Sequence, residues 1–166
     1  MYHGLFKPNI DMINLMVEYG SDDFIDGFEG DCKGAHKDIA MMMIEKGGNE
    51  FYAGMLNACC SGSKDMVMFV IDLKEKSQYK DKHENHQFED ESEHKDNEWD
   101  ILRWMNMFES ACKGGCMDII LFIIDRFEQM GEHIGETTYS RALCDSLKDK
   151  NRELSKFLLQ KLILSL

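Results

Sequence analysis

The sequence predicts an all-α fold in which helix–turn–helix units repeat along the chain and stack on one another. The first observation is an acidic residue that opens a helix and recurs at a fixed distance, because Asp11, Asp38 and Asp65 are 27 residues apart. Asp118 follows after 53 residues, which is 27 plus an insertion of 26, and Glu153 after 35, which is 27 plus 8. A fixed period of this length is typical of repeat architectures.

The second observation is a set of apolar columns that align when these acidic residues are used as anchors. The position fourteen residues before the anchor is aromatic, and the positions ten and six before it are apolar. These columns hold Phe24, Phe51, Trp104 and Tyr139; Phe28, Met55, Phe108 and Leu143; and Cys32, Cys59, Cys112 and Leu147. Apolar residues also follow each anchor at the first, fifth and sixth positions, so each helix has one face to bury.

The third observation is the punctuation between the apolar segments, where Gly and other small residues mark turns and helix ends. Gly20 ends the first helix, Gly34-Ala35 turns the chain, and Gly47-Gly48 ends another helix. In chain order we expect helices over residues 9–19, 24–32, 39–46, 51–60, 66–74, 99–113, 118–128, 139–148 and 152–164.

The anchors are expected to be N-terminal caps rather than catalytic groups, because they recur too regularly for a single site. Asp11, Asp38, Asp65 and Asp118 would each satisfy free backbone N–H groups, a contribution of about 1 kcal/mol. Asp22 and Asp23 are expected to cap the helix that follows them. Small residues seven and eleven positions before the anchors would let neighbouring helices approach closely. They are Ala58, Ala111 and Ser146, and Gly27, Gly54 and Ala142.

The turn and the helix that follows it resemble the ankyrin repeat. The resemblance rests on the small residue, the Gly and the acid-led apolar run in Ala58…Gly62…Asp65-Met-Val and in Ala111…Gly115…Asp118-Ile-Ile. It implies a single ankyrin-like solenoid over residues 1–166, with about four to five repeats. The Thr-Pro-Leu-His opening is absent and the period is shorter than the usual 33. Short, Met- and Cys-rich repeats of this kind are similar to the divergent ankyrin repeats of large DNA viruses.

Residues 75–100 interrupt the repeat with an acidic insertion. They carry ten acids and four lysines, a net charge of −6, and three of the six histidines. Few apolar residues are present, so we expect a loop or a disordered arm. His83 and His86 with their acidic neighbours could also bind a divalent metal, but a solvated acidic loop is the favoured interpretation.

Charge and composition exclude several classes of function. The net charge of −12 argues against nucleic acid and anionic membranes as partners, and no apolar run is long enough to span a bilayer. The first residues lack the layout of a signal peptide, so the six cysteines are expected to be reduced thiols in a cytoplasmic compartment, which is the host cytoplasm or the virion if the protein is viral.

No catalytic motif or phosphate-binding loop is present, so we expect a protein that is not an enzyme and needs no cofactor. Cys32, Cys59 and Cys112 share one column and could form a metal site. The favoured interpretation is that each thiol replaces a small buried Ala.

The expected function is binding of another protein. The ankyrin resemblance places the binding surface on the concave side, at the outward positions of the first helices. The predicted residues are Ile25, Asp26, Tyr52, Met105, Asn106 and Arg141. Tyr52 and Met105 are the expected anchors, with ordinary packing between repeats as the alternative. The alternative function is that of a structural subunit of a larger assembly, such as a virion component.

The C-terminal helix is apolar on more than one face. We expect Leu162, Ile163, Leu164 and Leu166 to contact a second copy, a partner, or further sequence if this chain is a fragment, so that the chain could self-associate through its ends. The alternative is that these side chains fold back on the last repeat.

Overall fold

The computed structural model describes the backbone of residues 10–84 and 100–165, and the side chains of the same residues except 78–84 and 165. Within these ranges the regular elements are helices and no strand occurs, which confirms the all-α prediction. The helices are α1 (Ile10–Glu18), α2 (Phe24–Gly34), α3 (Lys37–Glu45), α4 (Phe51–Ser61), α5 (Lys64–Glu84), α6 (Ile101–Gly114), α7 (Met117–Gln129), α8 (Glu136–Lys148) and α9 (Arg152–Ser165). None of these helices is both long and apolar enough to cross a bilayer.

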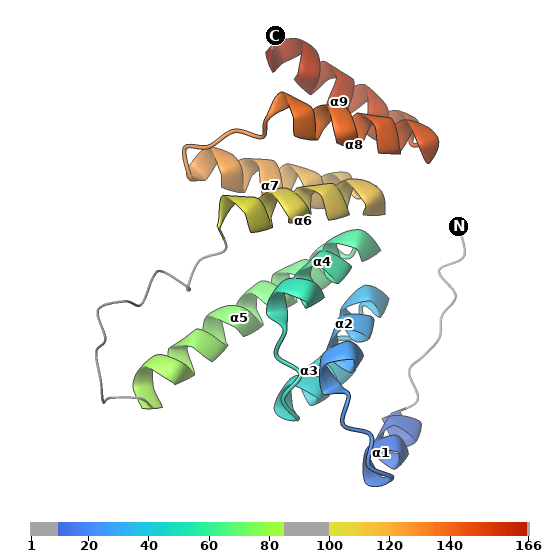
Figure 1. The fold of residues 1–166 in the computed structure, drawn as a ribbon, viewed down its shortest axis with the longest axis vertical. Coiled ribbons are helices and arrows are strands. Elements are labelled where there is room, and N and C mark those ends of the chain that lie inside the picture. The colour runs from blue at the N-terminus through green and yellow to red at the C-terminus, as the bar shows by residue number, and fades with distance from the viewer. Residues whose placement is uncertain (1–9, 85–99, 166) are drawn as a thin grey trace.

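Helices α2 to α9 are arranged as pairs stacked along the long axis of the molecule (Figure 1). Helix α2 pairs with α3, α4 with α5, α6 with α7, and α8 with α9, each pair being joined by a short turn. Helices α2, α4, α6 and α8 also pack against one another in sequence and form what we call the first-helix row. Helices α3, α5, α7 and α9 form the second-helix row, where contacts between neighbours are sparser.

The same turn joins the two helices of every pair. The residue three positions before the anchor has a positive φ in all four pairs: Ala35 (59°), Gly62 (74°), Gly115 (71°) and Lys150 (57°). At Ala35 and Gly115 the left-handed residue donates its backbone N–H to carbonyls of the last turn of the preceding helix, which closes that helix end. The repeat inferred from the anchors therefore also holds at the level of backbone conformation.

The prediction that the anchors are N-terminal caps is wrong. Asp38, Asp65 and Asp118 each stand at the second residue of their helix, and the helices α3 and α7 have no side-chain cap bond. Asp23 is the N-cap residue of α2, yet its side chain makes no cap bond either. At the second helical position a carboxylate interacts instead with the positive end of the helix dipole.

Other side chains cap three of the helices. The Ser63 hydroxyl accepts from the N–H of Met66 at 3.3 Å, and the Asp100 carboxylate accepts from the N–H of Arg103 at 2.8 Å. The Asn151 side-chain amide oxygen Oδ1 accepts from the N–H of Leu154 at 3.1 Å. Sequence spacing predicts most helix starts within one or two residues, and that of α8 three residues late. In α5 and α9 the hydrogen bonds assign the cap to the residue two positions before the anchor.

Helix α5 runs further than the sequence predicts. The sequence predicts that it ends at Lys74, but it continues to Glu84, ten residues into the acidic insertion. Nine residues after the anchor, the preceding units have Gly20 and Gly47, both with positive φ, where the chain leaves the helix. Lys74 occupies this position in α5, and no Gly or Pro follows before Glu84, so no residue stops the helix. The rest of the predicted loop, residues 85–99, lies outside the described residues.

The core follows the columns predicted from the sequence. The side chains ten positions before the anchor in the first three pairs, Phe28, Met55 and Phe108, are at most 1% exposed. Small residues permit the close packing of the first-helix row. A Cβ on Gly54 would lie 2.4 Å from the Phe28 ring, and a Cβ on Gly114 would lie 2.6 Å from the carbonyl oxygen of Cys60. Glycine is needed at these two positions because a neighbouring helix leaves no room for a Cβ, and not because of the backbone conformation.

Candidate protein-interaction surface

The predicted partner-binding residues of the repeats all lie on the first-helix row, but they differ in exposure. Ile25 on α2 is 42% exposed, and its neighbour Asp26 is also exposed. Tyr52 on α4 and Met105 on α6 are half-buried and pack against the core. Most of each of these two side chains is used in packing against the core, as the alternative interpretation, packing between repeats, expects.

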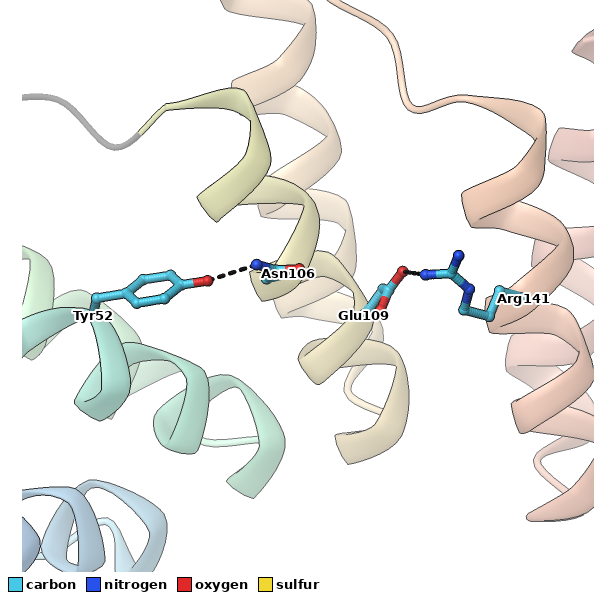
Figure 2. Close-up of polar contacts among 4 residues, drawn as sticks. All are labelled: Tyr52, Asn106, Glu109 and Arg141. Atoms are coloured by element: carbon cyan, nitrogen blue, oxygen red, sulfur yellow. Dashed lines mark hydrogen bonds and ion pairs between the residues drawn. The ribbon is translucent and has the colours of Figure 1, made fainter.

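Tyr52 nevertheless presents its hydroxyl group to the surface. The Asn106 side chain on α6 donates from Nδ2 to Tyr52 Oη at 2.7 Å, so two predicted residues from neighbouring pairs are joined directly (Figure 2). The Arg103 guanidinium lies 5.5 Å from the centre of the Tyr52 ring, within the range of a cation–π contact. Tyr52 is thereby held between the core, an amide and a cation.

Two more contacts extend this arrangement along the row. Arg141 on α8 donates from Nη1 to Glu109 Oε1 on α6 at 2.6 Å, and Figure 2 shows this pair beside the Tyr52–Asn106 bond. On the other side, Asn57 on α4 donates to Glu29 on α2 at 3.5 Å and to the carbonyl oxygen of Ala53 at 3.1 Å. The three contacts that join adjacent first helices are Glu29–Asn57, Tyr52–Asn106 and Glu109–Arg141, and together they form what we call the polar ladder.

The polar ladder adds little to stability. Asn106 and Arg141 are exposed, and exposed ion pairs and hydrogen bonds contribute about 0–1 kcal/mol. A similar exposed pair lies on α8, where Lys148 donates to Asp145 at 2.9 Å and this hydrogen bond lowers the pKa of the Asp145 carboxyl. The principal effect of such contacts is to hold long polar side chains in defined directions across neighbouring helices.

Sequence reasoning missed four members of this surface: Glu29, Asn57, Arg103 and Glu109. Glu29 and Glu109 stand nine positions before their anchors, one helical turn after the positions that were selected. Since residues four apart share a helix face, extending the selection by one turn would have included them. The pairing of Asn106 with Tyr52, 54 residues apart, leaves no comparable signal in the sequence.

The cysteine column lies in the core of the first-helix row. Cys32 and Cys59 are 0% exposed and Cys112 is 7% exposed. Burial raises the pKa of each of these thiols to about 12, so they are protonated at neutral pH and behave as small apolar groups. Among the described side chains no cluster of three or more metal-ligating groups occurs. The His83 side chain, with His86 and His94, lies outside what the structure describes.

The predicted contact residues of α9 also differ from one another. Leu162 is half-buried and packs against the core, as the alternative interpretation proposed. Ile163 and Leu164 are 62% and 74% exposed, while Leu166 lies outside the described residues.

Comparison with known proteins assigns no relative to this chain, since no family model, no curated protein and no solved structure matches it.

Proposed function

We propose that this chain is a protein-binding module built from ankyrin-like repeats, which contacts its partner through the first-helix row. The observation that carries the proposal is the polar ladder, which aligns Tyr, Asn, Arg and Glu side chains from four consecutive first helices on one surface. Tyr and Arg are enriched among residues that dominate binding energy.

Two properties of the surface support this function over a purely structural role for these side chains. The contacts within the ladder hold the side chains before a partner arrives, which reduces the entropy lost on binding. The first-helix row is also more closely packed than the second-helix row, so the stack is expected to curve toward it and offer a concave surface. The ankyrin resemblance implies binding on that same side.

The test uses the double variant Asn106→Ala/Arg141→Ala, whose two side chains are exposed, so the fold should be retained. Proteins retained by the wild-type chain from a lysate of its native cell would be identified by mass spectrometry, purified, and titrated by calorimetry. We expect the double variant to bind such a protein at least about tenfold more weakly. Lys156→Ala, an exposed change on α9 in the second-helix row, is the matched control. Equal affinity of the double variant and the wild type would contradict the proposal.

A structural subunit of a larger assembly is the second candidate function. It is supported by exposed apolar side chains at both ends of the stack. On α1 they are Ile10, Met12, Leu15 and Met16, and on α9 they are Leu159, Ile163 and Leu164. Binding through helix ends rather than through the first-helix row would leave the double variant fully active in the calorimetric test.

A further inference from the structure

The second-helix row carries an exposed apolar residue at the same position of three consecutive helices. Three residues after the anchor stand Met41 on α3, Met68 on α5 and Leu121 on α7, which are 38%, 40% and 47% exposed. Single exposed apolar residues are common on protein surfaces, but here the same helix position is apolar and exposed in three neighbouring helices of the row. We call these three residues the apolar stripe.

The stripe has a partly buried base. The next residue in each helix is Met42, Phe69 or Phe122, and all three are half-buried against the core. Lys37 of α3 lies with its Nζ atom 5.8 Å from the centre of the Phe69 ring on α5, which links adjacent helices beneath the stripe. Each residue of the stripe is therefore followed in its helix by a side chain that packs against the core.

Carboxylates flank the stripe on both sides. Three residues before it stand the anchors Asp38, Asp65 and Asp118, and four residues after it stand Glu45, Asp72 and Asp125. All six are exposed, and these positions share one helix face with the stripe. Within the described residues none of the six forms an ion pair, although Asp125 accepts a hydrogen bond from Gln129 at 2.7 Å.

Basic side chains near this surface are fewer than its carboxylates and offset part of their charge. Lys76 on α5 is exposed and stands four residues after Asp72 on the same helix face. Lys37 and Lys64 precede the anchors of α3 and α5, and Lys37 lies against the Phe69 ring. Arg126 on α7 stacks over the rings of Trp104 and Phe122, at 6.0 and 5.9 Å. The nine positions of the stripe and its two flanks contain three apolar residues, six acids and no base.

We propose that the apolar stripe and its acidic flanks are a second docking surface, which takes a basic amphipathic helix of a partner protein. Directly packed helices lie about 8–10 Å apart, and the helices of this row contact one another sparsely, so we expect successive stripe residues to be about 10 Å or more apart. A helix laid along the stripe rises about 1.5 Å per residue and meets the next stripe residue after about seven residues. The partner helix therefore has apolar residues at heptad spacing, with Lys or Arg on either side of that seam.

A second copy of this chain is a poor occupant of the same surface. The chain has a net charge of −12, and stripe against stripe would bring the flanking carboxylates of both copies together. Like charges that face one another disfavour this dimer, whereas a partner helix with Lys or Arg beside its apolar residues is attracted to the carboxylates.

The experiment titrates the full chain with a synthetic helical peptide of about 20 residues, long enough to hold a helix in water. It carries Leu at heptad spacing, Lys beside each Leu and Ala elsewhere, and binding is followed by fluorescence anisotropy. The stripe variant is Met41→Gln/Met68→Gln/Leu121→Gln. We expect its affinity for the peptide to fall by about tenfold or more, because three apolar contacts are lost. Circular dichroism should show an unchanged fold, because the three side chains are exposed.

Two controls separate this surface from general charge attraction. Leu102→Gln changes an apolar residue that is 65% exposed on α6, in the first-helix row, and should leave the affinity unchanged. A peptide of the same composition with scattered Leu residues should bind the wild type weakly. Equal binding of the two peptides, or an unchanged affinity of the stripe variant, would overturn the proposal. Sedimentation that shows a wild-type dimer lost in the stripe variant would assign the surface to a second copy instead.

Discussion

At the scale of single residues, the left-handed turn position distinguishes the units from one another. Gly occupies it in the second and third pairs, but Ala35 and Lys150 occupy it in the first and the last, with φ of 59° and 57°. A residue with a Cβ pays about 1–2 kcal/mol for this conformation. Two of the four turns are therefore strained by their sequence, although their hydrogen bonds are formed.

Ala35→Gly should stabilise the protein. Relief of the strain exceeds the extra entropy that Gly gives to the unfolded chain, about 0.4–1 kcal/mol, so the expected net gain is about 0.5–1 kcal/mol. Chemical denaturation monitored by circular dichroism would measure it. Gly62→Ala is the reverse control and should destabilise the protein, since φ is 74° there and a residue with a Cβ is strained in that conformation. A loss of stability in Ala35→Gly would contradict the assigned conformation.

The buried thiols give a second prediction at this scale, for alkaline pH. Cys32, Cys59 and Cys112 have folded pKa values of about 12 against 9.0 for a free thiol. The folded state thus holds protons that the unfolded state releases above pH 9, so stability is intact below that pH and falls as pH rises toward 12. The slope is up to about 1.4 kcal/mol per pH unit for each thiol.

Free Tyr and Lys side chains have reference pKa values near the same range, so the measurement compares two proteins. Urea unfolding would be followed for the wild type and for Cys32→Ala/Cys59→Ala/Cys112→Ala. The measurements would run between pH 8 and 11, an interval of about 3 units around the pKa of a free thiol. As pH rises, the wild type should lose stability relative to the variant, which lacks the three thiols. Parallel pH profiles would show that these thiols are not buried in the folded protein.

At the scale of helices, close approach within the first-helix row depends on residues without side chains. Gly54 of α4 faces the Phe28 ring and the Cys32 thiol of α2, whereas Gly30 of α2 has open space around its Cβ position. Both glycines lie inside helices, so intrinsic helix propensity treats them alike. Only packing between helices separates them.

Replacement of each glycine by Ala should therefore give opposite results. Gly30→Ala should stabilise the protein by about 1 kcal/mol through helix propensity. Gly54→Ala should destabilise it by about 1–3 kcal/mol, because the added methyl group must displace the Phe28 ring at 2.4 Å. Thermal unfolding of the two variants would decide, and equal shifts in the same direction would mean that α2 and α4 do not pack as described.

At the scale of the whole molecule, apolar columns that are buried in the preceding pair are exposed at the α8–α9 end of the stack. Leu147 and Leu159 are 60% and 50% exposed, while Cys112 and Ile124 in the same columns are both 7% exposed. Ile163 and Leu164 add to this surface. Within the described residues no further helix packs on it, and exposed apolar surface of this kind favours association.

The double variant Ile163→Lys/Leu164→Lys should stay monomeric at concentrations at which the wild type associates, because it places two charges on this surface. Sedimentation velocity over a range of concentrations is the measurement. Leu162 is half-buried against the core and is unsuited to this test. A wild type that is monomeric throughout, with no change in the variant, would contradict self-association through α9.

The sequence by itself determined the helices, the turns between paired helices and the buried columns. These features depend on local periodicity and on Gly at fixed places, so a repeat of 27 residues is sufficient to reveal them. Even the unexpected length of α5 has a local cause, since Lys74 stands where Gly20 and Gly47 end the earlier helices.

Only the tertiary structure decided which exposed side chains meet. The bonds between Tyr52 and Asn106 and between Glu109 and Arg141 join residues 54 and 32 positions apart, and they depend on the register of neighbouring units. Likewise, the rotation of α9 about its axis decides that Leu162 packs inward while Ile163 stays exposed. Register and rotation are set by the summed packing of many side chains, so no short segment of the sequence specifies them.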